Sequence, residues 1–331
     1  MTFSLGCNSE YNINLLPPSV SVYPKKASGD APYSTPEGTL RRAIQIPAGF
    51  TYGRKQPVIL VPGTGTKGCL TFTGNFIKLL SGTSYADPVW LNIPHFLLDD
   101  VQTNAEYVAY AINYISAISG KKNVAVIGWS QGNILSQWAL KYWPSTRSVV
   151  SDLISMSPDF HGSAGSTLLC VDGCAPAIIQ QDYNSQLIAA LRSNGGDSGY
   201  VPTTSIYSAA DQVVQPQSGT GASAYLKDAR NVGVTNNELQ VICPNVGNVT
   251  HEGVLYNGLA VALALDALQN AGPGQTSRLN LNTVCNQTAA PGLTLADIVS
   301  TENTIPIATI AIMLYPNKVI AEPALMAYAS T

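Results

Sequence analysis

A lone serine between two glycines, Ser130 in the segment "GWSQG" (128–132), constrains the fold more than any other feature. The preceding "VAVI" is typical of a buried strand, and the following "NILSQWAL" carries apolar residues at helical spacing. In a tight turn between a strand and a helix the backbone is strained, and the neighbours two positions away must lack bulk. The segment therefore predicts a turn that presents the Ser130 hydroxyl at the carboxyl end of a strand, where open α/β sheets bind ligands.

Strand and helix patterns alternate along the rest of the chain. We expect strands at 57–63, 89–94, 124–128, 152–158, 204–209 and 239–244, and helices at 102–119, 133–143, 253–268 and 304–315. This alternation predicts an α/β fold with a mostly parallel central sheet and helices on both faces. Residues 1–32, rich in Pro, Ser and Gly, are expected to form an irregular arm, and residues 33–331 a single domain.

The charge content limits the classes of partner. Only 11% of the 331 residues are charged and the net charge is −3, so no basic surface indicates nucleic-acid binding. The apolar run near the C-terminus is too short to cross a bilayer, so no transmembrane segment is expected. The first residues, "MTFSLGCNSEYNINLL", lack the pattern of a signal peptide. The low charge is typical of an extracellular protein or of one that meets an apolar substrate.

The cysteines and glycosylation sequons favour secretion. The six cysteines show no spacing suited to zinc, and an even number indicates disulfides and an oxidising compartment. Cys170 and Cys174 lie about one helical turn apart and are expected to bond to each other, whereas the partners of Cys7 and Cys69 stay open. Sequons at Asn248 and Asn286 agree with a secreted glycoprotein. We expect no metal and no cofactor.

A serine nucleophile needs a base, and the chain has three histidines. In this architecture the acid and then the histidine follow the serine in the sequence. His251 lies in a loop after the predicted strand 239–244 and is the base that we expect. His95 precedes the serine and is expected to be a packed or hydrogen-bonded loop residue. His161 follows the next strand and leaves almost no chain for an acid before it.

The acid that orients the imidazole is expected to be Asp211, which follows the predicted strand 204–209. A turn-capping role for Asp211 is the alternative. Asp159 and Asp182 are rivals, although Asp159 is expected to lie close to the strand of the serine itself.

A developing oxyanion needs preorganised donors. We expect one from the backbone N–H of Gln131 and one from the loop "GTGTKG" (63–68), where Thr64 adds a hydroxyl. A phosphate-binding loop is the competing interpretation, and it is rejected because no GK[ST] follows the glycines.

The segments "LVPGTGT", "WSQGN", "SPDF" and "VPTTSIYSAADQVVQPQ" resemble the fungal lipase B family of the α/β-hydrolase superfamily, across most of the chain. The resemblance implies an α/β-hydrolase fold and triacylglycerol lipase or carboxylic-ester hydrolase activity. It implies a catalytic triad and oxyanion hole made of the residues named above, and a disulfide between Cys243 and Cys285. It further implies Trp129 on the alcohol side of the substrate pocket, and Asp159, Gln181 and Val213 on the acyl side.

The apolar segment 304–315 has two interpretations. As a helix lining the mouth of the site, it would place Ile305, Thr309, Ile312 and Met313 on one face that meets lipid at an oil–water interface. The resemblance agrees with this placement. The alternative is a helix buried against the sheet.

Two other functions stay open at this stage. An esterase acting on short-chain esters or polyesters would carry the same residues, and in either case we expect a monomer. The segment 165–176 departs from the family pattern at the place that governs substrate range. A non-catalytic binding protein on the same scaffold would not need an intact set of serine, histidine and aspartate.

Overall fold

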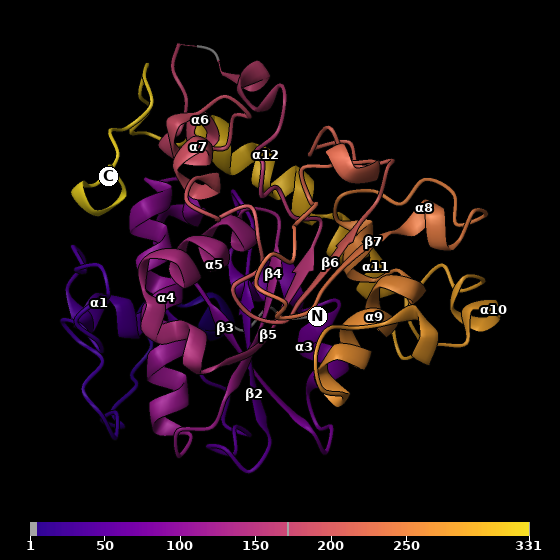
Figure 1. Ribbon diagram of the computed structural model, residues 1–331, viewed down its shortest axis with the longest axis horizontal. Helices are drawn as coiled ribbons and strands as arrows, with labels where there is room; N and C mark the ends of the chain where they lie inside the picture. The colour runs from indigo at the N-terminus through magenta and orange to yellow at the C-terminus, as the bar shows by residue number, and fades with distance from the viewer. Residues whose placement is uncertain (1–4, 171, 331) are drawn as a thin grey trace.

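A computed structural model describes residues 5–170 and 172–330 and is built around one seven-stranded sheet (Figure 1). The strand order is β1-β3-β2-β4-β5-β6-β7, and only β1 runs antiparallel to its neighbour. The strands are β1 (Ile44–Gln45), β2 (Gln56–Val61), β3 (Ala86–Leu91), β4 (Val124–Trp129), β5 (Val150–Met156), β6 (Thr203–Tyr207) and β7 (Val234–Glu238). The carboxyl ends of the six parallel strands therefore meet at one edge.

Helices cover both faces of the sheet (Figure 1). The helices of the described residues are α1 (Glu37–Arg42), α2 (Gly68–Phe72), α3 (Phe76–Leu80), α4 (Val101–Ile118), α5 (Gln131–Tyr142), α6 (Pro176–Gln180), α7 (Gln186–Arg192), α8 (Leu239–Ile242), α9 (Gly258–Gln269), α10 (Leu281–Val284), α11 (Leu295–Glu302) and α12 (Thr304–Leu314). On one face α4 and α5 pack against alternate strand residues such as Ile59 and Val126. On the other face α2, α3 and α9 pack against Leu60 and Ile127. The predicted α/β architecture, with helices on both sides of a mostly parallel sheet, is confirmed.

The predicted strand at 239–244 is wrong. The last strand is β7, five residues earlier, and the apolar run that follows it forms the short helix α8. β7 lies at the edge of the sheet and its sequence, "VTNNE", is half buried and polar, so it gives no apolar signal. Leu239 and Cys243 are buried four residues apart, which is the spacing of one helical face, whereas Val241 between them is exposed.

The other predicted elements are present with shifted ends. The strand expected at 89–94 is β3, which begins at Ala86, and the helix expected at 253–268 begins only at Gly258, after a short 3-10 turn, Gly253–Leu255. No helix in the described part of the chain is both long and apolar enough to cross a bilayer.

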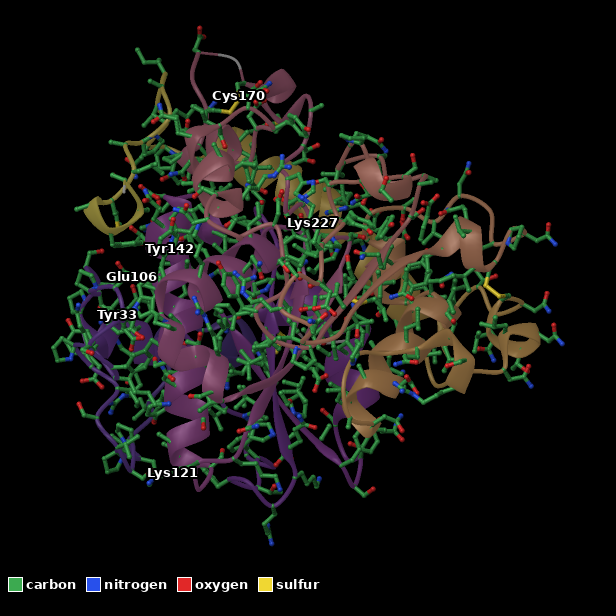
Figure 2. All side chains as sticks on the ribbon, viewed as in Figure 1. Tyr33, Glu106, Lys121, Tyr142, Cys170 and Lys227 are labelled. Carbon is green, nitrogen blue, oxygen red and sulfur yellow. A yellow bond between two sulfur atoms is a disulfide. The ribbon has the colours of Figure 1, made fainter. Side chains whose placement is uncertain are left out.

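All six cysteines are paired. The predicted disulfides Cys170–Cys174 and Cys243–Cys285 are present, and the remaining pair, Cys7–Cys69, joins the N-terminal arm to α2. Directly after the arm, Ser34 and Thr35 are held by Glu106 of α4, whose carboxylate accepts hydrogen bonds from the N–H and hydroxyl of Ser34 and from the Thr35 N–H. Figure 2 shows Glu106 close to Tyr33, and it places the Cys170 disulfide at the opposite end of the molecule from Lys121, which precedes β4.

Candidate active site

Ser130 lies directly between β4 and α5 and has the strained backbone that its flanking glycines predict. Its φ is 53° and its ψ is −130°, a combination that L-residues rarely adopt. A Cβ atom on Gly128 would lie 2.5 Å from Oδ1 of Asn133, and one on Gly132 would lie 2.4 Å from the Val61 carbonyl oxygen. Backbone atoms cannot move aside, so glycine is required at position 132, whereas a side chain at position 128 would have to displace the Asn133 amide.

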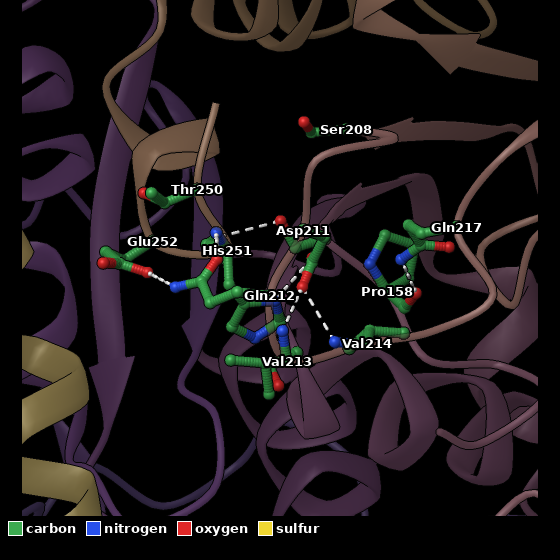
Figure 3. Close-up of polar contacts among 12 residues, drawn as sticks. Pro158, Ser208, Asp211, Gln212, Val213, Val214, Gln217, Thr250, His251 and Glu252 are labelled. Atoms are coloured by element: carbon green, nitrogen blue, oxygen red, sulfur yellow. Dashed lines mark hydrogen bonds and ion pairs between the residues drawn. The ribbon is translucent and has the colours of Figure 1, made fainter. Parts of the chain in front are cut away.

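His251 and Asp211 form a buried pair at the same edge of the sheet. Nδ1 of His251 lies 2.7 Å from Oδ2 of Asp211, and their side chains are almost completely shielded from solvent. The second carboxylate oxygen of Asp211, Oδ1, accepts hydrogen bonds from the backbone N–H groups of Val213 and Val214, each at 2.8 Å (Figure 3). Burial alone lowers the pKa of the His251 imidazole, but the charge and hydrogen bond of Asp211 outweigh it, so this pKa lies above its ordinary value.

The side chains of Thr64, Gln131 and Gln181 form a hydrogen-bonded chain beside Ser130. Gln131 donates from Nε2 to Oγ1 of Thr64, and Oγ1 of Thr64 donates to Oε1 of Gln181, both at 2.9 Å. The Gln131 amide also donates to the Leu97 carbonyl at 3.2 Å. The glycine that precedes Thr64 is required, because a Cβ on Gly63 would lie 2.8 Å from Cβ of Ser130. The Thr64 loop is therefore packed directly against the serine.

Ser130 and His251 line one cavity of about 200 Å³. Other residues that the sequence indicated also line it: Thr64, Trp129, Asp159, Gln181, Val213, Ile305, Thr309 and Ile312. The sequence did not indicate Ser163, Ser166, Ile178, Val214 or Ala308, which complete the wall. Of these, Ala308 lies one helical turn from Ile305 and Ile312, so helical spacing could have found it. Ser163 and Val214 lie in loops, Ser166 begins a short 3-10 helix, and Ile178 lies in the short helix α6, so none of them belongs to a periodic pattern.

Helix α12 forms one side of this cavity and is not buried against the sheet. Only Thr304 and Ala308 of the helix are buried, so the buried-helix interpretation is wrong. Ile305, Thr309 and Ile312 face the cavity, but Met313 does not; it is 61% exposed beside Leu314, which is 75% exposed. Ile305, Thr309 and Ile312 are spaced so that they share one face of the helix. Met313 follows Ile312 directly, so the helical repeat turns its side chain away from that face and toward solvent.

The alternative candidates for the base and the acid do not form a pair beside Ser130. His95 is exposed and pairs with Asp99, and His161 lies 3.5 Å from Asp197, outside the cavity. Asp182 accepts from the Asn184 N–H. Asp159 does line the cavity, yet its buried Oδ1 finds no hydrogen-bond partner among the described residues, and burial raises the pKa of this carboxyl to about 7.

A larger open hollow of about 790 Å³ lies at the opposite edge of the sheet, beside Lys55 and Lys122 at the start of β2 and β4. None of the predicted site residues lines it. In residues 5–170 and 172–330, no group of three or more His, Cys, Asp or Glu side chains is arranged to hold a metal ion.

Comparison with known proteins places the chain in a family. No family model matches it. Over 307 residues, covering 92% of this chain and 87% of the relative, it is 34% identical to lipase B of Pseudozyma antarctica. The crystal structure of Aspergillus fumigatus lipase B superimposes with a TM-score of 0.94 at 55% identity, covering 98% of this chain and 78% of that one. The chain therefore belongs to the lipase B family and has the α/β-hydrolase fold.

Proposed function

We propose that this protein is a secreted carboxylic-ester hydrolase of the triacylglycerol lipase type, working through an acyl-enzyme on Ser130. The observation that carries the proposal is the buried His251–Asp211 pair on a cavity that also exposes the strained serine. A buried imidazole held by a carboxylate, next to a serine on a strand-to-helix turn, is the arrangement that activates a hydroxyl for attack.

In the first half-reaction Oγ of Ser130 attacks the ester carbonyl carbon and its proton passes to Nε2 of His251. Asp211 fixes the ring through Nδ1 and stabilises the imidazolium that forms. The same proton then passes to the departing alkoxide, which leaves as the alcohol. Water repeats the sequence on the acyl-enzyme, with His251 as the base, and releases the carboxylic acid.

The negative oxygen of the tetrahedral intermediate needs donors that are already in place. The backbone N–H of Gln131, at the start of α5, is one such donor. Thr64 supplies a second through its hydroxyl: its oxygen already accepts from Gln131, so its own proton is free to turn from Gln181 to the substrate.

The substrate is proposed to enter from a lipid surface. Helix α12 forms one side of the cavity, and away from the cavity it exposes the apolar side chains of Ile310, Met313 and Leu314. An apolar rim of this kind lowers the free energy of contact with an oil droplet. We place the alcohol portion of the ester beside Trp129, and the acyl portion beside Asp159, Gln181 and Val213. The enzyme is proposed to act as a monomer.

Secretion is supported by the three disulfides, which persist in oxidising compartments. The sequon residues Asn248 and Asn286 are both exposed, so a glycosyl transferase can reach them.

Hydrolysis of three substrates tests the function: a long-chain triacylglycerol emulsion, a tributyrin emulsion and a short ester in solution. A triacylglycerol lipase hydrolyses all three, and Ser130→Ala abolishes each activity. Hydrolysis of the soluble ester and tributyrin alone would instead identify a short-chain esterase. No hydrolysis of any ester by the folded protein would contradict the proposal and favour a binding protein.

A further inference from the structure

Ser157, the residue directly after β5, has an unusual backbone. Its φ is 44°, in the left-handed region that favours glycine, although it carries a side chain and is fully buried. Its N–H donates to the Ile206 carbonyl at 2.9 Å, so the pairing of β5 with β6 holds it in this conformation. A non-glycine residue held in a sparsely populated conformation beside an active site suggests that its side chain has a task there.

The Ser157 hydroxyl contacts the backbone of the proposed general base. Its Oγ donates to the carbonyl oxygen of His251 at 2.9 Å. The same oxygen accepts a second hydrogen bond from Nε1 of Trp129, at 3.1 Å. A carbonyl oxygen has two lone pairs, so these two donors satisfy it.

The segment that carries His251 has little regular structure of its own. Residues 243–252, between α8 and the Gly253–Leu255 turn, form neither helix nor strand. Its position therefore depends on side chains from other loops. The His251 N–H donates to Oε1 of Gln212 at 2.8 Å, and Gln212 is held in turn by Glu252, as Figure 3 shows.

The end of β5 also holds the turn that carries the nucleophile. The carbonyl of Met156 accepts the Ser130 N–H at 3.1 Å and a hydrogen bond from the Asn133 amide, also at 3.1 Å. Two successive residues, Met156 and Ser157, thus bond to the backbones of Ser130 and His251, respectively. The end of β5 therefore fixes the position of the nucleophile Ser130 relative to the base His251.

We infer that Ser157 is a positioning residue that fixes the backbone of His251 relative to Ser130, and that its hydroxyl is the reason for a serine at this strained position. The inference rests on the proposed function, because it assigns His251 the role of base. Ser157 touches neither the substrate cavity nor the reacting atoms; it acts only through His251.

The test compares Ser157→Ala, Ser157→Gly and the control Ser155→Ala. All three remove a buried hydroxyl near the end of β5, but the Ser155 hydroxyl has no hydrogen-bond partner among the described residues. Because misalignment of catalytic groups acts on the chemical step, we expect kcat to fall about tenfold in both Ser157 variants with KM unchanged. The rate of reaction with a serine-directed phosphonate should fall by the same factor. Ser155→Ala should retain kcat.

The melting temperature separates positioning from general stability. Glycine relieves the strain at a φ of 44°. Ser157→Gly should therefore melt at or above the temperature of Ser157→Ala while losing as much activity. A kcat within about twofold of wild type in both variants, or losses of activity that follow the melting temperature, would overturn the inference.

A spectroscopic measurement keeps this test independent of the proposed function. The His251 Nδ1 proton, shared with Asp211, should give a downfield proton NMR signal that exchanges with solvent faster in both Ser157 variants than in Ser155→Ala. If the wild-type protein hydrolyses no ester, the proposed function fails while this comparison still reports on positioning. Equal exchange rates in all variants would contradict the positioning role.

Discussion

Nδ1 of His251 lies 2.7 Å from Oδ2 of Asp211, and neither side chain is reached by solvent. An imidazole buried without a partner would lose its proton readily, because burial disfavours the charged form. Asp211 reverses that tendency and raises the pKa of His251. The pair is therefore suited to hold the proton that a serine hydroxyl gives up, and the dependence of activity on pH follows from it.

The activity of the wild-type protein should rise with pH through a midpoint above about 6.5, the ordinary pKa of histidine, because His251 must be neutral to accept a proton. In Asp211→Asn the burial remains and the charge is gone, so the midpoint should move to lower pH. The value of kcat at neutral pH should also fall by about four orders of magnitude. A pH profile of kcat/KM on a soluble ester measures both effects.

Asp182→Asn is the matched control, since Asp182 bonds away from the pair, and it should keep the wild-type profile. An acid-side midpoint that stays in place in Asp211→Asn would show that Asp211 does not set the pKa of the base.

The stability of the protein should depend on Asp159. Burial raises the pKa of this carboxyl to about 7 in the folded protein, against about 3.9 in an unfolded chain. Its contribution to the free energy of unfolding is thus fully present below about pH 4 and is lost as the pH rises through 7. Asn cannot ionise, so Asp159→Asn should gain melting temperature relative to wild type between pH 4 and pH 8. A difference in melting temperature that is independent of pH would contradict this.

The Cys170–Cys174 disulfide should control local motion more than global stability. It spans a sequence separation of only 4, so it removes little entropy from the unfolded chain. Cys174 is also joined to Val319 by two backbone hydrogen bonds, beyond the end of α12. Replacing both cysteines by serine should therefore speed amide exchange around both residues and change the rate ratio between bulky and small esters. The melting temperature should change little.

Cys243 and Cys285, which are separated by 42 residues, provide the control pair. Their replacement by serine should lower the melting temperature more, because the closed loop is longer. An equal loss of melting temperature in the two double variants would count against the account of the short disulfide.

The exposed end of α12 should matter only at a lipid surface. Leu314 is 75% exposed and lies outside the catalytic cavity. Leu314→Asp should therefore weaken adsorption to long-chain emulsions and hydrolysis of them, while kcat/KM on a short soluble ester stays near wild type. Val241→Asp changes an apolar residue of similar exposure, 71%, on α8 and should affect neither substrate.

Ile312 lines the cavity itself, so Ile312→Asp should reduce hydrolysis of long-chain emulsions far more than hydrolysis of the soluble ester, with the melting temperature retained.

For Leu314→Asp, an equal loss of activity on the emulsion and on the soluble ester would indicate a change in the catalytic site and not in lipid contact.

The sequence predicts the elbow and the sheet well because both depend on short-range chemistry. Gly132 is required by the backbone carbonyl of Val61, and Gly128 makes room for the side chain of Asn133, five residues further along the chain. The interior parallel strands are buried on both faces, so each reads as an apolar run. Strand β7 lies at the edge of the sheet and is mostly polar, so its sequence does not form an apolar run and does not predict a strand.

The site residues that the sequence did not reveal depend on long-range contacts. Ser157 has no distinctive neighbours in the sequence, and its contact with His251 joins residues 94 positions apart. Ile178 reaches the cavity only because α6 packs beside Leu98 and Tyr315. Such contacts are set by tertiary packing, which periodicity does not encode.

The central claim is that Ser130 is the nucleophile, and covalent labelling tests it most directly. Treatment of the folded protein with a serine-directed phosphonate, followed by proteolysis and peptide mapping, should give one labelled peptide with the modification on Ser130. Labelling should be absent in Ser130→Ala and strongly slowed in His251→Ala, since the base is needed for attack. A label on any other serine, or none on Ser130 in the protein that hydrolyses esters, would contradict the account.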